Sequence, residues 1–425
     1  MIALRVALFL AIVAASCSAW RATPMYKKPF AKVGKAAVTG ILGIAIASTT
    51  TFGFSDKTVA DARLNAPSAA GTRVNSDPES LLRYGLPINN KQIRDIQQSI
   101  ESIKANIKTR RIPFAKIDAK NAENSLNSNQ AALLKAVPAN HQTMAAESLN
   151  RMKDDFGAVF TALDNELAAG AGSVQERKGL DDSFAAQDVL AKELSTFEEL
   201  LVPDEFKRVI PEEYADLPVL QRRANVEFVI KKADGSKFDV DGVLFDRVTL
   251  KMVVDGFNAP LTGGNFVDLV DAGFYTGKKI TRSDGFVVQT GDADPDGTVH
   301  GYVPKGASKE RTVPLEISLK GDKEILYGST SEEDSRGYAA AVLPFQSYGA
   351  MGMARGEFEN DSASSQFFWL LFESDLTPAG KNMLDGRYSC FGYAVEGAEQ
   401  LKDVKEGDII ESAKVTKGIE NLTKK

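Results

Sequence analysis

The residues with the clearest chemical potential lie in the last third of the chain, in three short runs. Residues 285–292 read Gly-Phe-Val-Val-Gln-Thr-Gly-Asp and closely follow Arg282. Residues 364–369 read Ser-Ser-Gln-Phe-Phe-Trp, and residues 384–392 begin Leu-Asp-Gly-Arg-Tyr. The arginine and glutamines donate hydrogen bonds, and the aromatic and aliphatic groups supply apolar surface. None of these groups is a strong nucleophile.

Histidine and cysteine are too scarce for several common kinds of chemistry. Only His141 and His300 occur, far apart in the sequence and without thiols nearby. Cys17 lies in a segment that we expect to be removed, which leaves Cys390 alone and excludes an intrachain disulfide. The sequence therefore argues against a transition-metal site and against a histidine-dependent nucleophile. We predict no metal and no cofactor.

The charge of the chain argues against nucleic acid as a partner. The chain has 425 residues, enough for two or three domains, and a formal net charge of −6. Because residues 1–62 contain seven Lys or Arg and two Asp or Glu, the remainder carries about −11. An acidic body without a basic stripe repels phosphate backbones.

The first 62 residues have the features of two targeting signals in series. Arg5 precedes a short apolar run, and small residues allow cleavage before Trp20. A basic, acid-free stretch follows, then a second apolar run at residues 36–54 and Ala-Asp-Ala at residues 60–62. Either run could instead be a membrane anchor, but the first is shorter than the roughly 20 residues that span a bilayer. We expect a signal peptide at residues 1–19 and a plastid transit and lumen-targeting segment at residues 20–62.

Residues 76–202 show helical periodicity and predict a helical bundle domain. Ser76-Asp-Pro-Glu79 is typical of a helix start. Three apolar stripes recur at spacings of three and four, and a further helix is expected to stop at Pro138. The stripes consist of Ile93, Ile96, Ile100, Ile103 and Ile107; Leu149, Met152, Phe156, Val159, Leu163 and Leu167; and Leu190, Leu194, Phe197 and Leu201. Such stripes form a shared core more often than a groove for a partner.

After a Pro-containing linker at residues 203–221, the periodicity changes from helical to alternating. Residues 226–230 and 248–254 alternate and are rich in β-branched residues, which predicts strands. Residues 259–272 predict one helix. Short strands with one or two helices favour a closed antiparallel β-barrel. The predicted fold class is therefore α+β and multidomain, a helical bundle followed by a closed barrel at residues 222–425.

The three runs, with Arg282, resemble the signature blocks of the cyclophilins, the barrel-shaped class of peptidyl-prolyl isomerases. The resemblance covers about residues 222–425 and implies a cyclophilin-like barrel. It implies that the catalytic residues are Arg282, Phe286 and Gln289. It also implies that substrate is bound by Met353, Ala354, Arg355, Gln366, Phe368, Met383, Leu384 and Tyr388.

The resemblance implies a reaction that needs no covalent chemistry. Rotation about a peptide bond faces a barrier of about 18–20 kcal/mol, because amide resonance must be broken. An enzyme lowers it by holding the proline ring in an apolar pocket and favouring the twisted amide. Arg282 would donate to the prolyl carbonyl and nitrogen, and Gln289 and Gln366 would orient the arginine and the substrate backbone. Phe286, Met353, Phe368 and Leu384 would form the pocket.

Several departures from the family pattern leave a second interpretation open. The segment between Arg282 and Phe286 is one residue shorter than usual, with Ser283-Asp284 replacing a longer apolar stretch. Met383 stands where most members have Trp, and Tyr388 where they have His. A large insertion also separates Asp292 from Met353. The alternative to an isomerase is a catalytically weak assembly factor or chaperone of the same fold that binds protein partners.

The combination of bundle and barrel is similar to multidomain cyclophilins of the thylakoid lumen. The supporting segments are residues 77–90 and 284–292, with weaker support from residues 406–412. This resemblance implies a role in folding and in photosystem II assembly or maintenance. It implies proline-containing polypeptides as partners, photosystem II subunits among them, and contact with the membrane that is peripheral at most. The order of the leader segments resembles that of algae with complex plastids.

Overall fold

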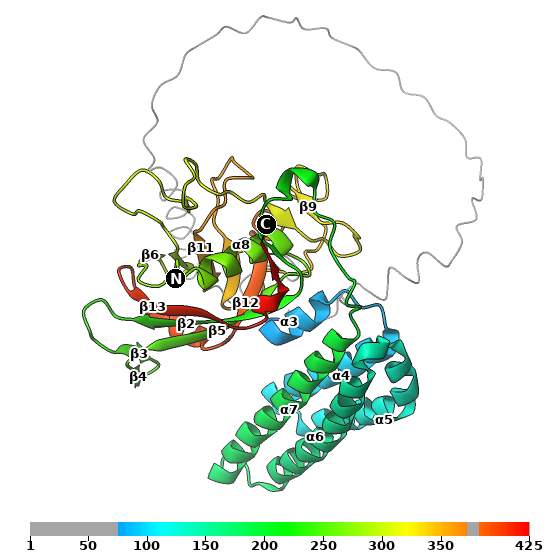
Figure 1. Ribbon diagram of the computed structural model, residues 1–425. Helices are drawn as coiled ribbons and strands as arrows, with labels where there is room; N and C mark the ends of the chain where they lie inside the picture. The colour runs from blue at the N-terminus through cyan, green and yellow to red at the C-terminus, as the bar shows by residue number, and fades with distance from the viewer. Residues whose placement is uncertain (1–74, 372–381, 425) are drawn as a thin grey trace, which may run out of the picture. The chain divides into compact units, whose positions relative to one another are not determined.

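The computed structural model describes residues 75–371 and 382–424, so both expected targeting segments lie outside the described residues. None of the helices in these ranges is long and apolar enough to cross a bilayer. Within these described ranges, five α-helices come first, followed by strands and one more α-helix (Figure 1). The α-helices are α3 (Pro78–Gly85), α4 (Lys91–Lys108), α5 (Ile112–Ala136), α6 (Gln142–Ala168), α7 (Val174–Leu200) and α8 (Pro260–Asp271).

The four helices α4 to α7 share one hydrophobic core, as their periodicity predicts. The isoleucine stripe of α4 is fully buried in it, together with Phe156 of α6 and Phe197 of α7. The helix before Pro138 ends at Ala136, and a Gly-containing segment separates α6 from α7. The prediction that Leu167 belongs to the buried stripe of α6 is wrong, because its side chain lies near the end of the helix and is 46% exposed.

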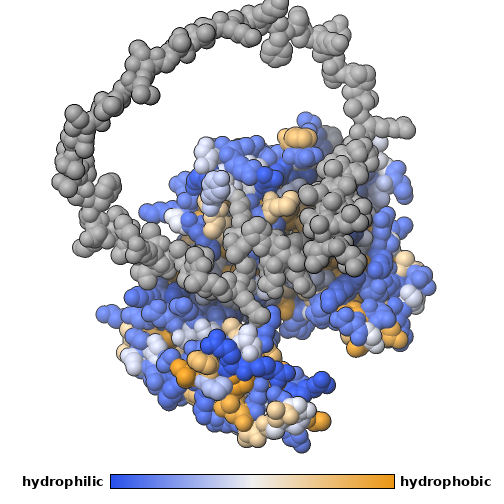
Figure 2. Space-filling model, turned by 180° about the vertical axis from the view of Figure 1, so that it is seen from behind, coloured by the Kyte–Doolittle hydropathy of each residue, from blue (hydrophilic) through white to orange (hydrophobic). Residues whose placement is uncertain are grey.

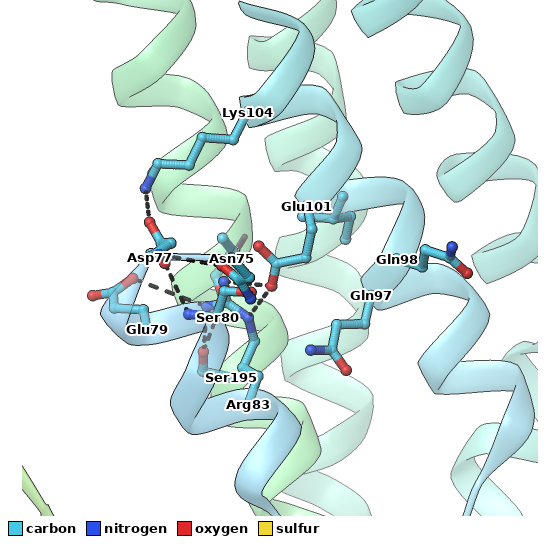
Figure 3. Close-up of polar contacts among 12 residues, drawn as sticks. Asn75, Asp77, Glu79, Ser80, Arg83, Gln97, Gln98, Glu101, Lys104 and Ser195 are labelled. Atoms are coloured by element: carbon cyan, nitrogen blue, oxygen red, sulfur yellow. Dashed lines mark hydrogen bonds and ion pairs between the residues drawn. The ribbon is translucent and has the colours of Figure 1, made fainter. Parts of the chain in front are cut away.

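The short helix α3 is held by polar contacts with α4 and α7 (Figure 3). Asp77, rather than Ser76, is its N-cap, and its carboxylate accepts a hydrogen bond from the Ser80 backbone at 2.8 Å. Arg83 is buried and contacts Glu101 of α4, with Nε to Oε1 at 2.8 Å, and Ser195 of α7 at 3.0 Å. A short helix is thereby fixed by charge-assisted bonds as well as by apolar contact.

The strands of the described residues form one large antiparallel sheet and three small two-stranded sheets. The eight-stranded sheet has the order β13-β2-β5-β12-β10-β11-β7-β6. Its inward residues and α8 enclose a core that contains Phe228, Phe266, Phe367 and Trp369. The strands are β1 (Val219–Leu220), β2 (Arg223–Lys231), β3 (Phe238–Val240), β4 (Val243–Phe245), β5 (Val248–Asp255), β6 (Ile280–Ser283), β7 (Val287–Thr290), β8 (Glu316–Ile317), β9 (Leu326–Tyr327), β10 (Ala350–Met353), β11 (Phe367–Leu370), β12 (Cys390–Glu396), β13 (Ile409–Lys417) and β14 (Leu422–Thr423).

The prediction of a closed barrel needs correction. The two ends of the large sheet, β6 and β13, do not form a regular ladder with each other. The chain just before β6 meets β13 at an isolated bridge between Lys279 and Ile409, with a few backbone hydrogen bonds around it, so the sheet is a half-barrel. The short β6 and its early bulge leave too little regular strand to continue the pairing. The antiparallel arrangement itself is as predicted.

The segment between β7 and β10 adds the hairpin β8–β9 and a buried acidic residue. Glu316 of β8 accepts hydrogen bonds from the backbone N–H groups of Leu261 and Thr262, at 3.1 and 2.8 Å. It therefore caps the N-terminus of α8. Burial raises the pKa of Glu316 to about 7, although these hydrogen bonds oppose the shift. The insertion is thus tied directly to the helix that covers the sheet.

The face of the molecule drawn in Figure 2 is mostly hydrophilic, with apolar residues in scattered patches. Among the described residues, the large exposed apolar side chains include Phe114 and Ile117 of α5 and Val243 and Leu244 of β4. Single exposed apolar residues of this kind are ordinary and do not by themselves define a site.

Candidate functional site

The candidate catalytic arginine lies next to a tight turn. Arg282 is in β6, and residues 283–286 connect it to β7 through Gly285, whose φ of 80° suits a glycine. The Asp284 Oδ1 atom accepts hydrogen bonds from the backbone N–H groups of Phe286 and Val287, both at 3.0 Å. Its Oδ2 atom accepts one from Arg282 Nε at 2.7 Å. The carboxylate therefore joins the turn to the arginine.

The pKa of Asp284 reflects this environment. Partial burial opposes ionisation, but the two backbone N–H groups and the Arg282 guanidinium hold the pKa of Asp284 below its ordinary value. Asp284 is therefore a carboxylate at neutral pH. The Arg282 side chain is 52% exposed and open to solvent beside it.

The two predicted glutamines lie beside the arginine on neighbouring strands. In the antiparallel register, Gln289 of β7 is opposite Arg282 on one side and opposite Phe368 of β11 on the other. Its Nε2 atom donates to Gln366 Oε1 at 2.9 Å. The backbone carbonyl of Gln366 accepts a hydrogen bond from the backbone N–H of Ala354 at 3.0 Å. The polar residues from the first two sequence runs thus form one continuous group.

Strand alternation separates the apolar residues of the site from the core of the barrel. In β11, Phe367 and Trp369 point into the core, whereas Phe368 points to the outer face of the sheet. Phe368 belongs there to a second cluster, which we call the outer cluster. Its buried members are Leu81, Leu82, Val287, Leu343, Phe345, Ala350, Phe368, Leu370, Cys390 and Tyr393, and its partly buried members are Val253, Phe286, Ala354, Leu384, Tyr388 and Val395.

The outer cluster holds Phe368 between the predicted Tyr388 and a second ring, Phe345, that the sequence did not single out. Phe345, from the insertion, stacks on Phe368 with ring centres 5.9 Å apart and an interplanar angle of 18°. Tyr388 meets the same ring edge-on at 5.9 Å. On β10, a Cβ added to Gly352 would lie 2.2 Å from Phe368 Cζ, so glycine makes room for the ring. The only sequence signal for Phe345 is the apolar Leu-Pro-Phe run within a largely polar insertion.

The predicted substrate-binding residues are not all brought together. Met353 points with Met351 into the barrel core, because it alternates with the outward Gly352. Its side chain therefore does not reach the outer cluster. Met383 is 76% exposed next to the half-buried Leu384. Arg355 lies 5.0 Å from the centre of the Tyr388 ring and donates to the Arg387 carbonyl.

The arrangement offers hydrogen-bond donors beside an apolar wall. Within residues 75–371 and 382–424, no group of His, Cys, Asp and Glu residues is arranged to hold a metal ion. Cys390 is buried, and burial raises the pKa of its thiol, so it is a poor nucleophile. His300 pairs with Asp292 at 3.0 Å on the surface. The chemistry available at the site is therefore binding and polarisation rather than covalent catalysis.

Comparison with known proteins gives two family matches. Residues 224–423 match the model described as cyclophilin type peptidyl-prolyl cis-trans isomerase/CLD. Residues 77–172 match the model for the PsbQ-like domain of CYP38-like peptidyl-prolyl cis-trans isomerases. The two matches fall on the sheet region and on the helical region respectively, and the helical match ends before α7 begins.

Three curated relatives align over most of the chain. The chloroplastic peptidyl-prolyl cis-trans isomerase CYP38 of Arabidopsis thaliana is 42% identical, over 81% of this chain and 75% of its own length. The Synechocystis sp. protein sll0408, named as a thylakoid lumen peptidyl-prolyl cis-trans isomerase, is 38% identical over 84% and 88%. The chloroplastic CYP37 of Arabidopsis thaliana is 33% identical over 86% and 74%. The similarity therefore includes both the helical and the sheet regions.

Proposed function

Because the chain belongs to the cyclophilin-type peptidyl-prolyl cis-trans isomerase family, we propose that its outer cluster and Arg282 accelerate cis–trans isomerisation of prolyl bonds in polypeptides. The observation that carries the proposal is the placement of Arg282, Gln289 and Phe368 on three adjacent strands in register. This placement puts donors next to an apolar surface, which is what stabilisation of a twisted prolyl amide requires.

Each side chain has a distinct role in the proposed mechanism. The Arg282 guanidinium donates to the prolyl carbonyl and to the nitrogen lone pair that appears when the amide twists. Phe286, Phe368 and Leu384 contact the proline ring. Gln289 and its partner Gln366 fix the substrate backbone through the side-chain amides. No proton is transferred and no covalent bond forms, so the barrier falls through binding of the twisted state alone.

A second candidate function is that of a catalytically weak assembly factor that binds protein partners through the same face. Two observations favour it. Arg282 is already paired with Asp284, and Phe368 is only 5% exposed beneath Phe345. Both features reduce what the site presents to a peptide in the absence of substrate.

The proposed location is the thylakoid lumen of a plastid, in an alga with a complex plastid. The leader segments and the names of the two relatives most relevant to location support it. The proposed partners are proline-containing polypeptides, photosystem II subunits among them, with the helical residues 76–202 and the sheet residues 222–425 acting as separate domains. Immunogold labelling or protease protection of isolated thylakoids tests the location, and recovery outside the lumen contradicts it.

The test of function is an isomerisation assay on the full chain with an Ala-Pro peptide, combined with a binding titration on the same sample. An isomerase shortens the relaxation, which takes roughly tens of seconds or longer when uncatalysed. Binding with unchanged relaxation supports the assembly factor instead. If the peptide neither binds nor isomerises faster, both candidate functions are contradicted.

A further inference from the structure

The Arg282 side chain pairs with Asp284, a residue of the adjacent turn that has no part in the proposed mechanism. Both Nε and Nη2 of its guanidinium contact Asp284 Oδ2. The residue directly across the strand pair, Gln289, instead donates its side-chain amide to Gln366. Two of the three nitrogen atoms of the guanidinium group that donates to the prolyl carbonyl in the proposed mechanism are therefore engaged by Asp284.

Asp284 is the fixed member of this pair. Its other oxygen, Oδ1, accepts two backbone hydrogen bonds from Phe286 and Val287, which hold the carboxylate against the turn. The Arg282 guanidinium is held by Asp284 alone among the contacts described above, and it stands on a long, half-exposed side chain. The position of Asp284 thus determines where the guanidinium rests.

We propose that Asp284 is a positioning residue that holds the Arg282 guanidinium against the β6–β7 turn and competes with the substrate carbonyl for it. The inference rests on the proposed function, since it concerns the same arginine. Each catalytic cycle must exchange the Asp284 contact for the contact with substrate. Asp284 therefore sets the catalytic rate below what the remaining residues allow.

The size of the effect follows from the exposure of the pair. Ion pairs between exposed side chains are weak, and salt screens them. Releasing the guanidinium should consequently raise kcat/KM about two- to fivefold rather than by orders of magnitude. The same reasoning predicts that added salt speeds the wild-type reaction by weakening the pair.

The test compares Asp284→Asn with the wild-type full chain. Asparagine keeps an Oδ1 acceptor for the two backbone N–H groups but places an N–H group toward the guanidinium, so the turn survives and the ion pair does not. The matched control is Asp334→Asn, because Arg336 Nε donates to Asp334 Oδ2 at the same sequence separation, outside the site. We expect kcat/KM to rise about two- to fivefold for Asp284→Asn and to stay unchanged for Asp334→Asn.

A double-mutant cycle separates this role from a structural one. In an Arg282→Ala background, Asp284→Asn should have no effect on kcat/KM, because its effect passes through the arginine. The salt-dependent increase should also disappear in Asp284→Asn. Thermal unfolding of each variant checks that the fold is intact.

Several outcomes overturn the proposal, and they differ from a failure of the proposed function. Equal or lower activity of a folded Asp284→Asn, beside an active wild type, overturns the positioning role alone. An equal gain in the Arg282→Ala background does the same. If the peptide binds but neither the wild type nor Asp284→Asn accelerates its isomerisation, the positioning role is wrong while peptide binding stands. Full activity of Arg282→Ala removes the proposed mechanism and this inference together.

Discussion

Arg83 of α3 and Arg282 of β6 each pair with a carboxylate, but their surroundings are opposite. Arg83 is 1% exposed and lies between Glu101 and Ser195 (Figure 3). The Arg282 side chain is 52% exposed and bonds to Asp284 within one turn. A buried pair cannot lose one partner without leaving a charge unpaired, whereas an exposed pair can exchange a partner for substrate at little cost. Burial therefore makes the first arginine structural and leaves the second available for function.

The largest effect expected from this comparison is on Arg83. Replacing it in Arg83→Met should lower the free energy of unfolding by about 3–5 kcal/mol, because Glu101 loses its buried partner. Urea unfolding of the full chain measures this. Arg151→Met is the control, since Arg151 is 52% exposed and its pair with Glu193 should be worth under about 1 kcal/mol. Equal losses for the two variants would contradict the distinction.

The same buried region predicts a dependence of stability on pH. Glu198 of α7 is fully buried, and burial raises its pKa to about 8, although Arg94 and Arg83 oppose the shift. In the unfolded chain its pKa returns to about 4.5, so between these values the folded state binds more protons. Stability should therefore fall as pH rises through this window, by up to about 1.4 kcal/mol per pH unit.

Glu198→Gln isolates this contribution. The variant should gain stability relative to the wild type when the pH is raised from 6 to 8, because the glutamine has no proton to lose. Urea unfolding at the two pH values gives the difference directly. A stability gap between the two proteins that does not change with pH would show that Glu198 is ionised throughout.

A smaller effect on stability is expected in the outer cluster, where Gly352 packs against Phe368. Gly352→Ala places a Cβ 2.2 Å from Phe368 Cζ, so the ring or the strand must move. We expect a loss of about 1–3 kcal/mol in unfolding free energy. Gly157→Ala in α6 is the matched control, because nothing lies within 4 Å of its Cβ and alanine favours a helix. If Gly352→Ala leaves the unfolding free energy unchanged, the packing around Phe368 is looser than the structure indicates.

How much of this could be predicted depended on whether the interactions are local. The isoleucine stripe of α4 and the alternation of residues 248–254 in β5 are properties of neighbouring residues, and both appear in the structure as predicted. The stacking of Phe345 on Phe368 depends on how a long insertion folds back, which no periodicity encodes. Whether β6 and β13 pair and close the barrel likewise depends on how many regular strand residues each of them provides, which the sequence pattern does not indicate. Leu167 fits the helical period, but it lies beyond the last layer of the shared core.

The candidate site divides in the same way. Resemblance placed Arg282, Gln289 and Phe368 together, and the strand register brings them together. It also placed Met353 in the pocket, whereas the alternation around Gly352 directs that side chain into the barrel core. Nor could it indicate that Asp284 pairs with Arg282, since a shortened turn has no family template to follow.

The most direct test of the account measures activity and stability together in Arg282→Ala, with Arg247→Ala as control. Arg247 is similarly exposed and pairs with Glu411 away from the site. We expect Arg282→Ala to change the unfolding free energy by less than about 0.5 kcal/mol and to lower kcat/KM for a prolyl peptide at least about tenfold, roughly 1.4 kcal/mol of transition-state stabilisation. Arg247→Ala should change neither quantity appreciably. Full isomerase activity in a folded Arg282→Ala would contradict the account.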